Sequence, residues 1–380
     1  MLVESWLARA ARANPDRLAV NELTYKELFA AAAARARELE PGSHVEIALP
    51  PGTAFAIELH AHLLAGPTPG EHDLDRVAVE VRTSGTTAEP RTVPLTYGNW
   101  LWSALGSAAA LGVDPNERWL CAMPLTHVGG LSILIRSAIY GTTAIVHERF
   151  ETGAVLEELM RPGGVTLVSL VPTTLARLLD AGLATPPTLR TILLGGAPIP
   201  PVLLERAVQA GVPVTPTYGL TEACSQVATD GRPLFCTTVE LADDGEVVVS
   251  GPTVSPACGG RLHTGDLGSW GDDGRLRIFG RKADTIITGG ENVAPAEVEA
   301  VLDQHPGVIE TAVLGEPDPE WGESVWALVR LGAPTKTAEL TAWCRERLAP
   351  HEVPKRIVIT EKPLPRTASG KLLRRSIRLP

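Results

Sequence analysis

The segment "VTLVSLVPTTLARLLDAGLATPPTLRTILLGG" at residues 165–196 decides the fold. It contains a β-rich run over 165–172, a helical stretch that begins at 173, and a second β-rich run over 189–196 that ends in two glycines. Two apolar strands joined by a helix form a β-α-β unit, which belongs to a parallel sheet covered by helices. Similar β-rich runs recur at 119–125 and 141–148. We therefore predict an α/β protein whose ligands collect at the carboxyl ends of its strands.

The pattern of apolar and polar residues changes after Gly260. The runs at 246–254 and 275–290, with a "DDG" turn at 272–274, indicate antiparallel strands. Beyond them, helical patterns at 294–306 and 337–349 alternate with strand patterns at 308–318 and 324–331, which predicts an α+β unit. We place the boundary at Arg281, which gives an N-terminal domain over 1–281 and a C-terminal domain over 282–380.

Composition restricts the class of protein. The 380 residues exceed the size at which a single core stops growing, in agreement with two domains. The formal net charge of -10 argues against binding to nucleic acid, although a local cluster of cations can still bind small anions. The five cysteines form no C-x-x-C pair, so neither disulfides nor a zinc site are expected. The N-terminus lacks the pattern of a signal peptide, and no apolar run is long enough for a bilayer. We expect a cytoplasmic protein without membrane insertion, as a monomer or homo-oligomer.

Several polar loops carry chemistry. "TSGTTAEPR" at 83–91 crowds hydroxyls, a glycine and a cation together, but it lacks the glycine-lysine pair of the common P-loop and could equally be a polar turn. "PTYGLTEACSQ" at 216–226 offers a ring for a base, a hydroxyl and a carboxylate suited to Mg²⁺. "LHTGDLG" at 262–268 presents a carboxylate between two glycines, where it can accept from both ribose hydroxyls. The last two segments are "GRKADTIITGGENVAPAEVE" at 280–299 and "PRTASGKLLRR" at 365–375.

In this order and spacing, the five segments resemble the adenylate-forming superfamily of acyl-CoA ligases, luciferases and peptide-synthetase adenylation domains. The resemblance runs from residue 80 to the C-terminus. It implies a large N-terminal domain of covered mixed sheets with flanking helices, and a small mobile α+β C-terminal domain. It also implies two half-reactions, in which a carboxylate first attacks the α-phosphate of MgATP to give acyl-AMP and pyrophosphate. A thiol then displaces AMP.

The resemblance assigns roles to residues at matching positions. Those implied for ATP phosphates are Thr83, Ser84, Gly85, Thr86, Thr87 and Arg91. Those implied for the rest of the nucleotide are Gly195, Gly196, Ala197, Tyr218, Gly219, Asp266 and Arg281. Thr221 is expected to contact the α-phosphate, Glu222 to hold Mg²⁺, and Lys371 to bridge the carboxylate and the α-phosphate. The hinge is expected at Ala283, and Gly289 and Gly290 are expected to face the CoA channel. Without the resemblance, Asp266 could merely cap a turn and Arg281 could pair with a nearby carboxylate.

The sequence of the middle of the chain restricts the class of acid expected as the substrate. Residues 123–150, 168–179, 192–207 and 218–229 resemble the 2-succinylbenzoate-CoA ligases of menaquinone synthesis. The expected acyl pocket comprises His127, Gly130, Ser169, Gly195 and Gly196. His127 is also assigned a catalytic role as the gate of this pocket.

The second carboxylate of a diacid must be solvated or paired, because an unpaired buried anion is costly. The polar candidates for this task are His127, Ser169, Arg136 and Arg177. For each arginine an exposed or inter-helix salt bridge is an equally good interpretation, and a core position is the alternative for His127.

Two features depart from the superfamily pattern. Alanine stands at position 88 where glycine is usual, and Arg91 stands where lysine is usual. If position 88 needs a left-handed backbone, alanine costs roughly 1–2 kcal/mol. We expect adenylation to be retained, and to be slower if that cost applies. The region before residue 78 is also short for the superfamily. The alternatives are a ligase for another aromatic or medium-sized acid, an adenylation domain that serves a carrier protein, and a nucleotide-binding paralogue that has lost catalysis.

Overall fold

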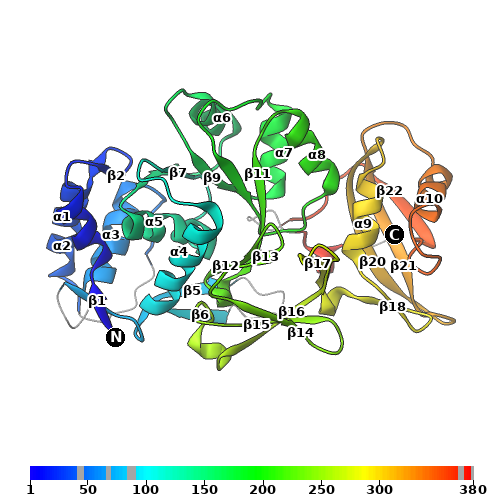
Figure 1. Cartoon of the computed structure of the whole chain (residues 1–380). Coiled ribbons are helices and arrows are strands. Elements are labelled where there is room, and N and C mark those ends of the chain that lie inside the picture. Colours follow the sequence, from blue (N-terminus) through cyan, green and yellow to red (C-terminus); the bar gives the residue numbers. More distant parts are fainter. Residues whose placement is uncertain (41–46, 66–69, 84–90, 367–371, 378–380) are drawn as a thin grey trace.

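The computed structural model describes residues 1–40, 47–65, 70–83, 91–366 and 372–377. Its elements follow one another across the molecule (Figure 1). The N-terminal helices, in blue and cyan, lie at one end, the green strands and helices lie in the middle, and the yellow-to-red C-terminal elements lie at the other end. No helix of the described part is long and apolar enough to cross a bilayer.

A nine-stranded mixed sheet forms the centre of the larger part. Its strands, in spatial order, are β13 (Arg232–Pro233), β12 (Ser225–Thr229), β11 (Val214–Leu220), β10 (Thr191–Leu194), β9 (Leu167–Leu170), β7 (Arg118–Cys121), β8 (Thr143–Val146), β2 (Leu18–Val20) and β3 (Leu23–Thr24). The strands from β11 through to β2 pair in parallel, and both edges are antiparallel. The β-α-β interpretation of residues 165–196 is confirmed, because β9 and β10 are parallel neighbours joined by a helix.

Helices cover both faces of this sheet. They are α1 (Trp6–Ala13), α2 (Tyr25–Ala36), α3 (Thr53–Leu64), α4 (Tyr97–Leu111), α5 (Val128–Tyr140), α6 (Thr152–Met160), α7 (Pro172–Asp180) and α8 (Pro201–Gln209). Side chains alternate between the faces of a strand. In β7, Trp119 and Cys121 therefore pack into the core formed with α1–α5, whereas Leu120 packs into the core formed with α6–α8.

Smaller sheets flank the central one. Two antiparallel two-stranded sheets pair β1 (Leu2–Glu4) with β4 (Glu71–Asp73) and β5 (Val77–Thr83) with β6 (Arg91–Thr96). An antiparallel sheet contains β14 (Thr238–Leu241), β15 (Glu246–Ser250), β16 (Arg261–Trp270) and β17 (Leu276–Arg281). The short helical turns of this region are η1 (Thr221–Ala223), η2 (Pro256–Cys258) and η3 (Lys282–Asp284). The predicted turn at 272–274 joins β16 and β17, as expected.

The C-terminal part is an α+β unit, as predicted. Its elements are β18 (Ile286–Thr288), β19 (Glu291–Val293), α9 (Pro295–Asp303), β20 (Val308–Asp318), β21 (Gly322–Leu331), α10 (Thr337–Arg345), β22 (Arg356–Thr360) and η4 (Arg374–Ser376). Pro295 occupies the first turn of α9, where its missing N–H costs no hydrogen bond. Val298, Leu302, Val313 and Leu340 belong to a core of its own. This organisation is compatible with a boundary at Arg281, which stays a prediction.

Candidate active site

The carboxyl edge of the central sheet brings several predicted residues together. Neighbouring strands β9, β10 and β11 end beside Ser169, the Gly195–Gly196 pair and the segment 218–222. A side chain at Gly195 would lie 2.6 Å from the Thr217 carbonyl oxygen, and Gly196 has a left-handed φ of 80°. Only glycines therefore let the loop after β10 pass so close to β11. The result is a polar edge lined by backbone, as predicted for a ligand site in a parallel sheet.

Three predicted nucleotide residues form one hydrogen-bonded group. The Tyr218 hydroxyl donates to Asp266 Oδ2 at 2.7 Å, and Arg281 Nε donates to Asp266 Oδ1 at 2.9 Å. Asp266 and Arg281 face each other across β16 and β17. Burial, followed by the Asp266 charge, raises the pKa of Tyr218, so its hydroxyl stays a donor. The pairing of Arg281 with a nearby carboxylate, which was the alternative to a role in nucleotide binding, is thus present, and that carboxylate is Asp266.

Thr221 and Glu222 lie in η1, directly after β11. The Glu222 side chain makes no hydrogen bond or ion pair with another residue of the described part. A single uncommitted carboxylate fits Mg²⁺, which takes one or two protein carboxylates and completes its shell with water and substrate phosphate. No group of three or more metal-binding side chains occurs among the described residues. The donor set at Glu222 thus suits a magnesium ion that arrives with a nucleotide.

The chain after η1 has an unusual backbone. Cys224 and Ser225 have φ values of 52° and 91°, a backbone conformation that residues other than glycine rarely adopt. At the adjacent bulge, a side chain on Gly219 would lie 1.8 Å from the Ser225 carbonyl oxygen. Strain of this kind concentrates at functional sites, where surrounding contacts hold it.

Ser255 links this region to the predicted phosphate loop, and sequence reasoning missed it. Its N–H donates to the Glu222 carbonyl at 2.8 Å, and its hydroxyl donates to the Pro94 carbonyl of β6 at 2.7 Å. A serine directly before Pro256 was the available signal, because such pairs initiate turns. The backbone and the side chain of this one residue therefore join the β5–β6 pair to the segment that carries Glu222.

The two ends of the predicted phosphate loop are paired. Thr83 faces Arg91 across β5 and β6, and its hydroxyl donates to the Arg91 carbonyl at 3.1 Å. The predictions for Ser84, Gly85, Thr86, Thr87 and Ala88 lie outside the described residues, as does that for Lys371.

The predicted acyl pocket groups around the start of α5 and the end of β9. His127 is the residue that precedes α5, and Gly130 lies in its first turn. A side chain at Gly130 would lie 2.6 Å from the Pro124 carbonyl oxygen. Ser169 is buried, and its Oγ accepts from Trp119 Nε1 at 3.1 Å.

Arg136 is fully buried, which overturns its interpretation as a salt-bridge residue. Its side chain is 1% exposed, and its two terminal nitrogens donate to Gln226 Oε1 and Ser103 Oγ, each at 2.8 Å. Its guanidinium carbon lies 5.9 Å from the ring centroid of Trp119. No carboxylate of the described residues pairs with it, and burial lowers its pKa. The other candidate, Arg177, is exposed on α7.

The predicted hinge and thiol-channel residues lie at the start of the C-terminal part. Ala283 is in η3, and Gly289 and Gly290 form the turn between β18 and β19, with φ values of 61° and 86°. A side chain at Gly289 would lie 2.7 Å from the ring of Trp321. Gly289 is thus required both by its backbone angle and by close packing.

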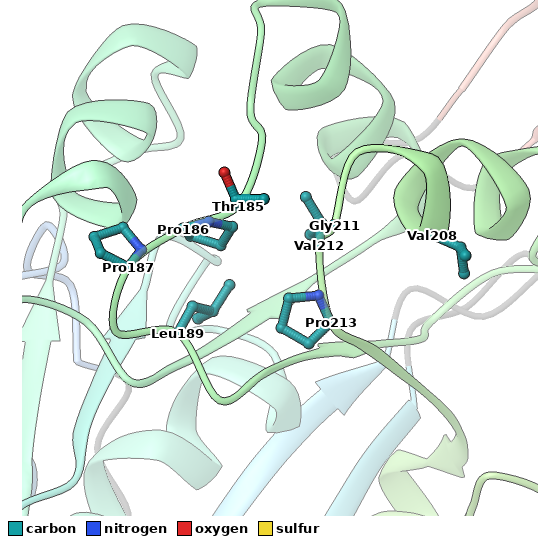
Figure 2. A pocket seen from close by; sticks show the side chains of 8 residues that line it. All are labelled: Thr185, Pro186, Pro187, Leu189, Val208, Gly211, Val212 and Pro213. Atoms are coloured by element: carbon teal, nitrogen blue, oxygen red, sulfur yellow. The ribbon is translucent and has the colours of Figure 1, made fainter.

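One hollow lies away from these residues (Figure 2). It has a volume of about 570 Å³ and is lined by Thr185, Pro186, Pro187, Leu189, Val208, Gly211, Val212 and Pro213. These residues precede β10 and β11, so the hollow opens at the amino ends of the strands. It is at the opposite edge from the polar loops and is not the candidate active site.

Comparison with known proteins decides the family. The family described as AMP-binding enzyme matches residues 67–257, and the AMP-binding enzyme C-terminal domain matches residues 297–371. The chain belongs to the AMP-binding enzyme family. Within this family, the 2-succinylbenzoate–CoA ligase of Bacillus subtilis is 40% identical over 338 residues, which cover 80% of this chain and 69% of the relative. The ligase of the same name from Geobacillus kaustophilus is 43% identical, over 80% of this chain and 70% of the relative.

Solved structures agree with this assignment to the AMP-binding enzymes. The o-succinylbenzoate CoA synthetase of Bacillus subtilis in complex with the acyl-adenylate intermediate matches with a TM-score of 0.91 and 33% identity, over 99% of this chain and 98% of that one. Its complex with ATP and magnesium ion has the same TM-score and identity, over 99% of both chains. A double mutant of that synthetase bound to a product analogue gives a TM-score of 0.71, over 100% of this chain and 99% of that one.

Proposed function

We propose that this AMP-binding enzyme is an ATP-dependent 2-succinylbenzoate–CoA ligase of menaquinone synthesis. One carboxylate oxygen of the acid attacks the α-phosphorus of ATP, which forms acyl-AMP and breaks the bond to pyrophosphate. The thiolate of CoA then attacks the acyl carbon, and AMP leaves with the oxygen that had belonged to the carboxylate. The curated relatives of this name support the substrate, and the buried cation Arg136 is the feature of this chain that carries it.

We assign residues at the carboxyl edge of the central sheet to the parts of the nucleotide. We assign the ribose to the Tyr218–Asp266–Arg281 group, because a carboxylate accepts hydrogen bonds and can receive those of the ribose hydroxyls. Thr221 follows β11 and is assigned to the α-phosphate, and Gly195, Gly196, Ala197 and Gly219 to the walls of the nucleotide site. Mg²⁺ held by Glu222 supplies positive charge to the phosphates. The loop between Thr83 and Arg91 is assigned to the β- and γ-phosphates, and Lys371 to the charge that develops during adenylation.

The buried charge of Arg136 gives a chemical reason why the acyl pocket would prefer a diacid. A buried guanidinium without a carboxylate partner is costly, because desolvation of the charge is not repaid by an ion pair. Trp119 lies between Arg136 and Ser169, since it contacts the guanidinium with its ring and Ser169 with its N–H. A second carboxylate in this region would complete the ion pair that Arg136 lacks. We therefore assign Arg136 to the carboxylate that is not activated, and His127, Gly130 and Ser169 to the rest of the pocket.

We further propose two domains that meet at Arg281 and rotate about Ala283. The difference between the TM-scores of 0.91 with the acyl-adenylate complex and 0.71 with the product-analogue complex supports two orientations, because almost the whole chain is covered in both comparisons. In the second orientation, the turn at Gly289 and Gly290 would face the channel for CoA. The cytoplasmic location and the oligomeric state stay predictions.

A pyrophosphate-release assay over a panel of carboxylic acids, with and without CoA, tests the function. We expect release with 2-succinylbenzoate and ATP, and 2-succinylbenzoyl-CoA with AMP when CoA is added. Activity on benzoate or fatty acids but none on 2-succinylbenzoate would refute the substrate. No release with any acid would favour a paralogue that has lost catalysis.

A further inference from the structure

The chain on both sides of residues 367–371 is fixed to the C-terminal sheet. Arg366 and Leu372 form an antiparallel bridge, and the Leu373 N–H donates to the Pro365 carbonyl at 2.9 Å. Before the bridge, the Leu364 N–H donates to Glu310 Oε2 at 3.1 Å, and Leu364 packs in a small core with Ala312 and Ile377. The described chain before and after this segment is therefore held next to β20.

Arg374 adds a stronger attachment three residues after Lys371. Its Nη2 donates to Glu299 Oε2 at 2.5 Å and its Nη1 to Asp284 Oδ2 at 3.4 Å. The exposed fractions of the three side chains are 20%, 11% and 31%, in the order Arg374, Glu299, Asp284. Partial burial makes such charge-assisted bonds stronger than those of a surface ion pair.

The two carboxylates come from elements that matter for the proposed domain rotation. Asp284 lies in η3, next to Ala283. Glu299 lies in α9, and its second oxygen accepts from the Val313 N–H of β20 at 2.8 Å. Arg374 thus joins the C-terminal segment to the turn at the hinge and, through Glu299, to the sheet of its own domain.

We propose that Arg374, held by Glu299 and Asp284, is a positioning residue for adenylation, because it fixes residues 372–377, which directly follow Lys371 in the chain. This inference rests on the role of Lys371 in the proposed function. Three residues of chain span at most about 10 Å, so the place of Arg374 limits where the lysine can reach. A displacement of about 1 Å can cost about a hundredfold in rate, which gives the two salt bridges a direct effect on the first half-reaction.

The test separates the two half-reactions in the full-length enzyme. Arg374→Gln removes the charge, Arg374→Lys keeps it without the fork, and Asp284→Asn removes only the bond to the hinge turn. Arg345→Gln is the matched control, because Arg345 is exposed on α10 of the same domain. Each variant is assayed for acyl-AMP formation from 2-succinylbenzoate and ATP, for conversion of supplied acyl-AMP to the CoA thioester, and for its thermal unfolding midpoint.

For Arg374→Gln we expect acyl-AMP formation to fall by about 10- to 100-fold in kcat, with thioester formation from supplied acyl-AMP changed by less than about twofold. Arg374→Lys should recover part of the loss, and Arg345→Gln should match the wild type. An equal fall in both half-reactions, with a lowered unfolding midpoint, would assign Arg374 a purely structural role and overturn the proposal. Unchanged adenylation in folded Arg374→Gln would overturn it as well.

Lys371→Ala, assayed in parallel, distinguishes this inference from the proposed function. If Lys371→Ala abolishes adenylation and Arg374→Gln does not affect it, only the inference about Arg374 fails. If Lys371→Ala leaves adenylation intact, or if the wild type forms no acyl-AMP, the proposed function fails and the inference fails with it.

Discussion

Arg136→Gln tests the substrate most specifically. The Arg136 side chain is 1% exposed, and no carboxylate of the described residues neutralises it. If the second carboxylate of 2-succinylbenzoate pairs with it, the variant leaves that anion buried without a partner. Breaking a buried charge pair in this way costs about 3–5 kcal/mol. Each 1.4 kcal/mol is about a factor of ten, so kcat/KM for 2-succinylbenzoate should fall by at least about a hundredfold.

The comparison substrate is benzoylpropanoate, which is the same acid without its ring carboxylate. Because it cannot pair with Arg136, its kcat/KM should change little or rise in the variant. The ratio of the two kcat/KM values therefore reports the ion pair itself, as in a double-mutant cycle. Arg177→Gln is the control, since Arg177 is exposed on α7 and its loss should leave the ratio within about twofold.

Initial rates of pyrophosphate release with both acids provide the measurement, and circular dichroism establishes that the variant is folded. Equal losses for the two acids would refute the ion pair, because a general disturbance of the pocket does not distinguish them. A folded variant that retains the wild-type ratio would refute it as well.

Three further predictions address the nucleotide site and the C-terminal part. Lys371→Ala should abolish acyl-AMP formation and leave conversion of supplied acyl-AMP to the thioester, and equal loss of both steps in separate assays would refute its role. Tyr218→Phe removes the hydrogen bond to Asp266, so the Kd for ATP in calorimetry should rise by about tenfold, and an unchanged Kd would show that this bond does not organise the ribose site. Burial raises the pKa of Asp303 from 3.8 to about 7, so its contribution to stability is lost as the pH rises between these values. The free energy of unfolding in urea should therefore rise by about 3 kcal/mol for Asp303→Asn, relative to the wild type, between about pH 5 and pH 8. A difference between the two proteins that does not depend on pH would contradict the raised pKa.

Local patterns in the sequence were sufficient for most of the fold. The strands and helix of residues 165–196, the turn at 272–274 and α9 with Pro295 follow from apolar periodicity and from proline and glycine positions, which act over short distances. The carboxyl-edge location of Gly195 and Tyr218 followed from the parallel sheet.

The features that could not be predicted from the sequence depend on contacts between residues that are far apart in the chain. The state of Arg136 depends on Gln226, 90 residues further along the chain, and on Ser103 in another helix. Ser255 meets Pro94 across 161 residues. The left-handed backbone at Cys224 carries no residue signal, because neither cysteine nor serine favours that conformation. Such features depend on contacts that form only when the sheet is complete.

In the proposed reaction, the acid is activated by direct attack on the α-phosphate. The most direct measurement uses 2-succinylbenzoate with heavy-isotope oxygen in its carboxylates, together with ATP, Mg²⁺ and CoA, followed by mass spectrometry of the products. We expect one heavy oxygen in AMP and none in pyrophosphate, because AMP leaves with the oxygen that attacked phosphorus. Unlabelled AMP, or label in orthophosphate with formation of ADP, would contradict it.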